Sequence, residues 1–261
     1  MAANPVHKIV RFRIGRSSGY GLLEGGAIYR LSGSIFGEFK RGEKVGRVDA
    51  ARLLSPCVPS KVVAVGRNYS DHVAEIGGAV PEEPRMFFKP PSSIVGPGAD
   101  IVYPSMTKHV EAEAELAIVM RRKARNVSEA NALDYVLGYT CANDVSARDI
   151  QHREAMPNRA KAFDTFCPLG PCIAVGLDPS NLAIQSRVNG QVRQSSSTSL
   201  LIHNVPRIIS FISEVLTLLP GDVILSGTMA GTPKLVPGDV VDIVIEGIGE
   251  LSNRVVAQGK K

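Results

Sequence analysis

The chain has 261 residues, of which 44% are hydrophobic and 21% are charged. This length allows one large core or a large domain with a small partner, and this composition excludes disorder as the dominant state. No segment has the apolar length of a signal peptide or of a membrane-spanning helix, so we expect a cytoplasmic protein that does not enter a membrane. The four cysteines lack CxxC spacing, which favours reduced, buried thiols.

The charge of the chain favours a small anionic partner. The net charge is +5 and the pI is near 9.1, and an excess of positive charge suits an anion. A nucleic-acid-binding surface would also need clustered basic residues and aromatic side chains for stacking. The tightest basic cluster lies at residues 121–125, aromatic residues are only 5% of the chain, and tryptophan is absent. We interpret that cluster as a solvated loop and expect no nucleic-acid partner.

The first fifty residues predict a small β meander, because apolar and polar residues alternate there around turn-like glycines. The polar stretch at about 40–60 is interpreted as a connection or a short helix. A buried strand follows at 62–65, so we place a domain boundary near its start. The predicted domains are a small N-terminal β domain at 1–58 and a main domain at 59–261.

The rest of the chain predicts mostly strands with a few packed helices, an α+β architecture without regular βαβ alternation. One helix is expected at about 204–219, with Asn204 as its N-cap and Pro206 in its first turn. A second helix is expected at about 128–134. The expected strands are 62–65, 114–120, 135–144, 172–176, 183–190, 223–227 and 240–247.

The stretch 109–120, HVEAEAELAIVM, places three glutamates at every second position before an apolar run. On a strand, Glu111, Glu113 and Glu115 would share one face, where like charges repel unless a cation lies among them. A surface helix that keeps the charges solvated is the alternative, but the Ile and Val of the short apolar run favour the strand. Asp144 brings a further carboxylate to the end of a later apolar strand. Hard carboxylate oxygens suit Mg²⁺, Mn²⁺ or Ca²⁺ rather than zinc.

Three other segments carry polar groups suited to catalysis or anion binding. If a short helix starts just before His72, then Glu75 lies on the same face, where it can orient the imidazole of a general base. An ordinary surface pair is the alternative. Lys161 could neutralise a substrate carboxylate or simply be solvated. The segment 227–232, which contains Thr228, could be an anion cradle or a plain turn.

Seven blocks of the sequence, taken together and in order, closely resemble the fumarylacetoacetate hydrolase family. The resemblance covers about residues 61–255, and any one block alone would be weak. The blocks are KVVAVGRNYSDHVAEIG, FFKPPSSIVGPG, EAEAELAIVM, GYTCANDVSARDIQ, AKAFDTFCPLGP, VNGQVRQ and VILSGTMAGT.

The resemblance implies a fold and a metal site. The fold is a mixed β-sandwich roll behind a small N-terminal β domain, assembled as a homodimer. The implied metal is Mg²⁺ or Mn²⁺, with Ca²⁺ able to replace them in crystals. Residue-by-residue matching makes Glu113, Glu115 and Asp144 the metal ligands and leaves Glu111 outside the ligand set.

The same matching implies the residues that act on the substrate. His72 and Glu75 resemble a water-activating dyad carried on a mobile lid, and Lys161 resembles a catalytic lysine. The implied substrate-binding residues, which hold the carboxylate and the keto oxygen, are Arg148, Gln151, Lys161 and Thr228, with a weaker case for Lys89 and Ser93.

The resemblance, together with these residues, implies a Mg²⁺-dependent enzyme. We expect it to act on a small α-keto or enol dicarboxylate by C–C bond hydrolysis or decarboxylation, through an enolate that the metal stabilises. One alternative is isomerisation of 2-hydroxyhepta-2,4-diene-1,7-dioate in aromatic catabolism. Another is a non-catalytic metal-binding protein on the same fold. His72, Glu75 and Lys161 favour an enzyme, because a structural metal site has no use for an open coordination position.

Overall fold

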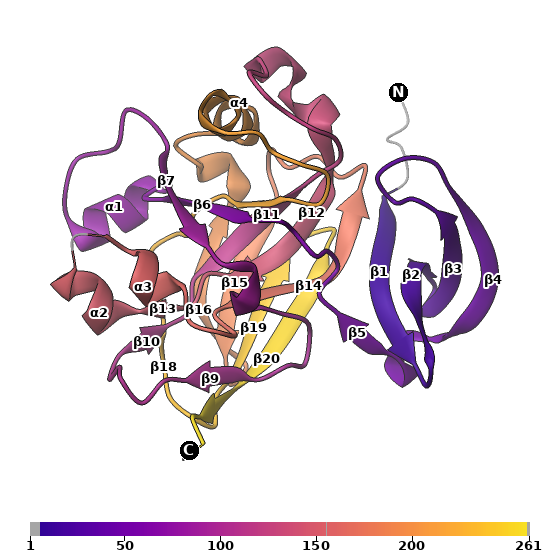
Figure 1. Ribbon diagram of the computed structural model, residues 1–261. Coiled ribbons are helices and arrows are strands. Elements are labelled where there is room, and N and C mark those ends of the chain that lie inside the picture. The colour runs from indigo at the N-terminus through magenta and orange to yellow at the C-terminus, as the bar shows by residue number, and fades with distance from the viewer. Residues whose placement is uncertain (1–5, 155, 260–261) are drawn as a thin grey trace.

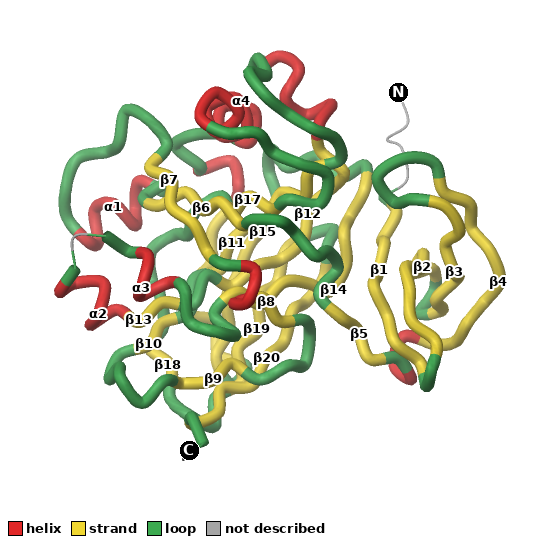
Figure 2. Tube along the Cα trace, in the orientation of Figure 1, coloured by secondary structure: helices red, strands yellow, loops and turns green. Residues whose placement is uncertain are grey.

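The computed structural model describes residues 6–154 and 156–259 and consists mainly of strands (Figure 1). They form a twelve-stranded, a five-stranded and a three-stranded sheet, flanked by short helices (Figure 2). The strands are β1 (His7–Ile14), β2 (Ser17–Glu24), β3 (Ala27–Gly33), β4 (Phe39–Arg47), β5 (Arg52–Leu54), β6 (Val62–Gly66), β7 (Arg85–Lys89), β8 (Ile94–Val95), β9 (Ile101–Tyr103), β10 (Val110–Glu111), β11 (Ala114–Met120), β12 (Val136–Asn143), β13 (Ser146–Ala147), β14 (Cys167–Val175), β15 (Ala183–Val188), β16 (Gln191–Ser197), β17 (Val223–Leu225), β18 (Lys234–Leu235), β19 (Val240–Ile245) and β20 (Gly249–Ala257). The helices are α1 (Ser70–Ile76), α2 (Arg148–Arg153), α3 (Asn158–Lys161) and α4 (Val205–Val215), with 3₁₀ helices at Val48–Ala50, Pro91–Ser93, Glu129–Tyr135 and Thr198–Leu200. The mostly β, α+β architecture expected from the sequence is confirmed.

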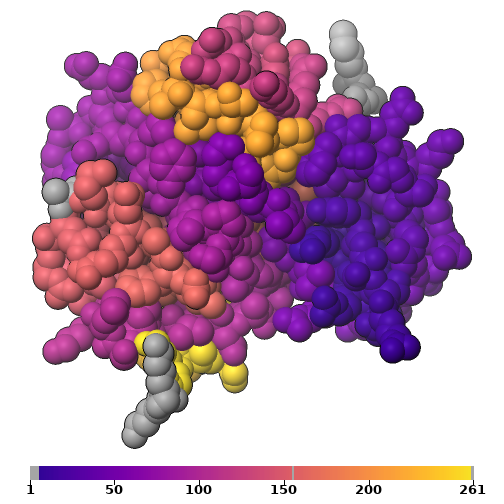
Figure 3. Space-filling view, viewed as in Figure 1, coloured from indigo at the N-terminus to yellow at the C-terminus, as the bar shows by residue number. Residues whose placement is uncertain are grey.

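The N-terminal strands β1 to β4 pair in order as the predicted antiparallel meander, which forms the indigo lobe of Figure 3. β1 also pairs with β14, so the meander extends the large sheet. The interpretation of 40–60 as a connection or short helix is wrong for its first part, because β4 continues to Arg47. The mostly exposed, polar side chains of β4 suit an edge strand. This strand was missed because it lacks apolar alternation, and the domain division at residue 58 stays a prediction.

The strand β11 lies inside the large sheet, between β12 and β17, and all its side chains are buried. Leu116, Ile118 and Met120 join the core cluster shared with the five-stranded sheet, whereas Ala117 and Val119 join a second apolar cluster. Alternate residues of a strand point to opposite faces, so β11 is covered on both sides. This explains its continuous apolar run, and it confirms the strand over the helix for this part of the sequence.

The helix predicted at 204–219 is α4, and Asn204 caps it as expected by accepting a backbone N–H bond. The helix ends at Val215, before its predicted end, because Leu218 pairs with Ala124 in an antiparallel bridge. The second predicted helix is present as the 3₁₀ helix at 129–135.

The four cysteines are buried free thiols, as expected. Burial raises the pKa of Cys57 to about 12 and that of Cys172 to about 11. In the described ranges, no helix has the length and apolar character needed to cross a membrane.

Candidate active site and metal centre

The acidic stretch 109–120 passes from one sheet to another. β10 belongs to the three-stranded sheet and β11 to the large sheet, so the single strand expected here is two strands with Glu113 in the break. Asn143 holds this break, because its Oδ1 accepts the backbone N–H of Glu113 at 3.0 Å. The backbone N–H of Asp144 donates to the carbonyl of Glu113, also at 3.0 Å. These bonds bring Glu113 beside Asp144, which follows β12.

Three carboxylates meet at this break: Glu113, Glu115 and Asp144. One oxygen of each lies within 4.8 Å of an oxygen of the other two. Their exposed fractions are 4%, 2% and 0%, so water neutralises little of their charge. The structure thus brings together the three residues that the resemblance implied as ligands, and three hard oxygens suit a divalent ion such as Mg²⁺ or Mn²⁺.

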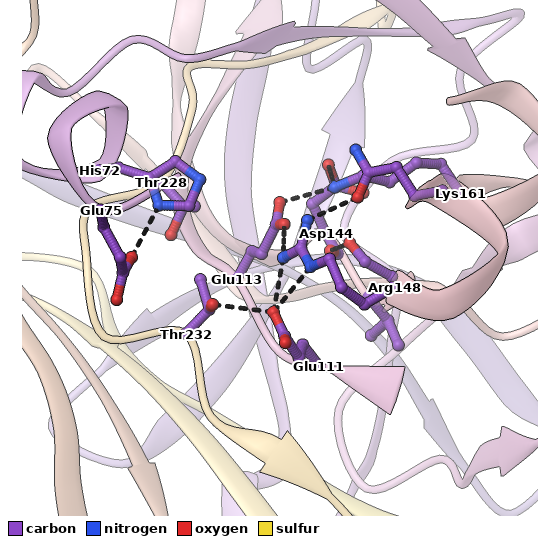
Figure 4. A network of polar contacts seen from close by, with 12 residues as sticks. His72, Glu75, Glu111, Glu113, Asp144, Arg148, Lys161, Thr228 and Thr232 are labelled. Atoms are coloured by element: carbon purple, nitrogen blue, oxygen red, sulfur yellow. Dashed lines mark hydrogen bonds and ion pairs between the residues drawn. The ribbon is translucent and has the colours of Figure 1, made fainter. Parts of the chain in front are cut away.

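Buried cations neutralise two of the three carboxylates (Figure 4). The Nζ of Lys161 donates to Glu113 at 2.6 Å and to Asp144 at 2.8 Å. Lys89 donates to the other oxygen of Asp144 at 2.5 Å, and Arg148 donates to Glu113 at 2.6 Å. Burial would raise the pKa of Glu113, but the charges of Lys161 and Arg148 lower it below its usual range. Glu113 is therefore an ionised carboxylate.

The third carboxylate, Glu115, has no cationic partner in the described part of the chain. Its Oε2 accepts the backbone N–H of Gly227 at 2.6 Å. Burial, together with the charges of Asp144 and Glu113, raises the pKa of Glu115 well above its usual value. A divalent ion fits these residues, because it would bring to Glu115 the positive charge that no described side chain supplies by direct contact.

Glu115→Gln should stabilise the metal-free protein at neutral pH. Because the pKa of Glu115 is raised, the folded state keeps a proton that the unfolded state releases above about pH 4.5, so stability falls as the pH rises. The glutamine removes this loss and also removes a metal ligand. Thermal unfolding in EDTA should show that the variant's gain over wild type is larger at pH 8 than at pH 5. Mg²⁺ should raise the melting temperature of the wild type far more than that of the variant, and a variant that melts below wild type in EDTA at pH 8 would contradict this account.

Arg148 is fixed by a network outside the carboxylate cluster. Its Nε donates to Glu111 at 2.8 Å and its Nη1 donates to Gln151 at 2.5 Å. Glu111 also accepts the hydroxyl of Thr232 at 2.8 Å and lies 2.8 Å from the Nε2 of His109. Glu111 therefore orients Arg148, whereas the sequence indicated only that it lay outside the ligand set. No motif spacing pointed to the threonine or to His109.

The expected dyad forms on α1. The Nδ1 of His72 lies 3.1 Å from the Oε2 of Glu75, and His72 is only 5% exposed. Glu75 also accepts the backbone N–H of Gly231 at 3.0 Å, which ties α1 to the segment 227–232. That segment therefore directs two of its N–H groups at protein carboxylates, Glu75 and Glu115. With Nδ1 held by Glu75, the Nε2 of His72 is left for the cavity (Figure 4).

One cavity of about 680 Å³ joins His72 to the carboxylates, and Glu75 is not among its lining residues. Lys89 is not among its lining residues, because the side chain is buried against Asp144. Ser93 lies away from the cavity and donates to the carbonyl of Pro90. The hydroxyl of Thr228 accepts a hydrogen bond from the side-chain amide of Gln194 at 2.8 Å. The sequence did not predict this contact. The predicted site residues that line the cavity are His72, Glu113, Glu115, Asp144, Arg148, Gln151, Lys161 and Thr228.

Comparison with protein families gives two matches. Residues 61–256 match the family described as fumarylacetoacetate (FAA) hydrolase, C-terminal. Residues 7–56 match the family described as Rv2993c-like, N-terminal.

Two relatives illustrate the likeness in sequence. Protein Rv2993c of Mycobacterium tuberculosis is 50% identical over 212 residues, which is 80% of this chain and 80% of that protein. The mitochondrial oxaloacetate tautomerase of Xenopus laevis is 44% identical over 217 residues, which is 78% of this chain and 68% of that protein.

Two solved structures illustrate the likeness in fold. The 2-hydroxyhepta-2,4-diene-1,7-dioate isomerase of Mycobacterium marinum is 42% identical, with a TM-score of 0.91 over 97% of this chain and 100% of that chain. The fumarylpyruvate hydrolase of Pseudomonas aeruginosa, solved in complex with Mn²⁺ and pyruvate, is 32% identical, with a TM-score of 0.73 over 76% of this chain and 90% of that chain. The fold expected from the resemblance is confirmed.

Proposed function

Because the chain belongs to the fumarylacetoacetate hydrolase family, we propose that it is a Mg²⁺-dependent enzyme that acts on a small α-keto or enol carboxylate by C–C bond hydrolysis or decarboxylation. The observation that carries this proposal is the shared cavity. His72 on one side and the buried carboxylate cluster on the other line the same space. A purely structural metal site would have no need of a histidine that lines the same cavity as the carboxylates.

The carboxylate end of the cavity would hold the metal and one end of the substrate. A divalent ion bound by Glu113, Glu115 and Asp144 supplies Lewis-acid stabilisation of negative charge that develops on a keto oxygen. Lys161 orients two of these carboxylates through charge-assisted hydrogen bonds, and its charge favours the ionised form of Glu113. Arg148 holds the remaining oxygen of Glu113, so the cluster is positioned before any substrate enters.

The dyad end of the cavity would handle the proton. A neutral His72 whose Nδ1–H donates to Glu75 has a free lone pair on Nε2. Nε2 then accepts a proton from a water molecule as that water attacks the distal carbonyl of the substrate. Glu75 stabilises the imidazolium that forms, and the bond from Gly231 fixes the orientation of Glu75. The same proton can be returned to the leaving carbon.

Two assays test the proposed function. The first follows the loss of ultraviolet enol absorbance of an acylpyruvate, and the second follows CO₂ release from oxaloacetate. Each is run with Mg²⁺ and with EDTA. We expect turnover of at least one substrate that requires Mg²⁺. No reaction on either, with 2-hydroxyhepta-2,4-diene-1,7-dioate also inert, would favour a metal-binding protein without turnover.

Isomerisation is a second candidate function. The relative from Mycobacterium marinum that covers nearly the whole chain is named for isomerisation of 2-hydroxyhepta-2,4-diene-1,7-dioate. The same site suits this reaction, because His72 could move a proton between two carbons of the substrate instead of activating water. Mg²⁺-dependent conversion of this dioate without cleavage, in the absence of acylpyruvate hydrolysis, would favour the isomerase.

The proposal also covers the metal, the cellular compartment and the oligomeric state of the enzyme. Mg²⁺ is proposed as the physiological metal, with Mn²⁺ as its replacement. A cytoplasmic homodimer is proposed as the working form, on the strength of the family resemblance.

A further inference from the structure

The strand β7 forms one wall of the cavity and directs three side chains to the same face. Alternate residues of a strand share a face, so Arg85, Phe87 and Lys89 point the same way. Lys89 contacts the metal cluster through Asp144, and the ring of Phe87 lies 5.4 Å from the Nζ of Lys161. Arg85 is at the other end of β7, about 13 Å from Lys89 at about 3.3 Å per residue. β7 therefore leads from the carboxylate cluster, past an aromatic ring, to a guanidinium.

A second arginine of the cavity follows the neighbouring strand. Gly66 of β6 pairs with Arg85 of β7, and Arg67 is the next residue after Gly66. Both arginines line the cavity. Among the residues that the structure describes, neither makes an ion pair or a side-chain hydrogen bond. Glu154, an acid of the same cavity, is already paired with Arg159.

The backbone at Arg67 indicates that its placement is specific. Its φ is +57°, in the left-handed region that residues with a Cβ rarely adopt. Its Nη1 lies 2.7 Å from where a Cβ on Gly78 would stand, so a larger residue at 78 would displace the guanidinium. Strained backbone of this kind persists where the surrounding structure requires it, often at binding sites.

We propose that Arg85, assisted by Arg67, binds the distal carboxylate of a dicarboxylic substrate and selects it over a monocarboxylic one. This rests on the proposed function, in which the keto carboxylate occupies the metal end of the cavity. Two guanidinium groups that line one cavity, without acidic partners among the described residues, favour an anion there, because it would reduce the repulsion between them. A guanidinium binds a carboxylate through two parallel hydrogen bonds. Phe87 would lie along the carbon chain that joins the two ends.

Calorimetry with two keto acids of equal chain length tests this subsite. The probes are 2-oxoadipate and 2-oxohexanoate, which differ only in the distal carboxylate, each titrated into the full chain with Mg²⁺. We expect the wild type to bind the diacid about 10-fold or more tightly, as for a charge-assisted hydrogen bond. Arg85→Gln should lose most of this preference, and Arg85→Lys should keep part of it. Arg52→Gln, on the exposed surface of β5, changes the net charge equally and should keep the full preference.

The outcomes separate this inference from the proposed function. Equal affinity of the wild type for both acids, binding of neither, or an undiminished preference in Arg85→Gln would overturn the subsite. A preference that depends on Arg85, in a protein that turns over no substrate with Mg²⁺, would support the subsite and reject the catalytic proposal. Circular dichroism of each variant confirms that a lost preference is not a lost fold.

Discussion

Replacing His72 with alanine should reduce Mg²⁺-dependent hydrolysis of an acylpyruvate by about 10²- to 10⁴-fold, the usual contribution of a general base. The reason is that His72 offers the cavity its Nε2 while Glu75 holds Nδ1 at 3.1 Å. Mg²⁺ affinity, measured by calorimetry, should change little, because His72 is not among the three clustered carboxylates. Hydrolysis is followed by the loss of ultraviolet enol absorbance.

Two comparisons make the His72 result specific. Glu75→Gln keeps the size of the side chain and removes its charge, so it should lower the rate by less than His72→Ala. His7→Ala, at the exposed start of β1, should leave the rate at the wild-type level. If His72→Ala hydrolysed the substrate as fast as the wild type, the dyad assignment would be wrong.

Replacing Glu113 with glutamine should weaken Mg²⁺ binding by at least about 100-fold, because loss of partners outside the first coordination shell already costs about 10- to 100-fold. Glu113 offers an ionised oxygen to the cluster, and the amide is a weaker ligand without charge. The change also leaves Lys161 with one carboxylate partner instead of two. Calorimetric titration of metal-free protein with Mg²⁺ and with Mn²⁺ measures the effect.

Glu111→Gln is the matched control for Glu113→Gln. Glu111 is also buried and acidic, but it accepts bonds from Arg148 and Thr232 and lies outside the carboxylate cluster. Glu111→Gln should therefore weaken Mg²⁺ binding far less than Glu113→Gln. Unchanged affinity in Glu113→Gln, or an equal loss in both variants, would reject the ligand assignment.

Local patterns were enough to predict several elements of this fold. The short run of Ile and Val after the glutamates predicted the strand β11, and Asn204 followed by Pro206 predicted the start of α4. These signals succeed because side-chain alternation and helix capping depend on residues close together in the chain. The edge strand β4 has no such signal, since most of its residues are exposed and none is buried.

The break at Glu113 shows where local patterns failed. The expected strand 114–120 matches β11, but the glutamate spacing extended the strand interpretation back to 109, across the break. The break depends on the side chain of Asn143, which accepts the backbone N–H of Glu113 from the next strand of the sheet. Asn143 is thirty positions from Glu113, so the alternation of polar and apolar residues around Glu113 does not reveal this hydrogen bond.

The sequence by itself determined which chemistry this protein can hold: acidic residues spaced to meet at a strand end, a histidine with a glutamate one helical turn away, and seven blocks in the order of one family. The tertiary structure decided which cations and N–H groups bind each of these carboxylates. Lys161 reaches Glu113 across 48 positions, and Gly227 reaches Glu115 across 112. Such pairs depend on the register of strands that are distant in the chain. For that reason two features became visible only in the folded protein. Glu115 has no cationic partner among the described residues, and within the same part of the chain Arg67 and Arg85 are unpaired.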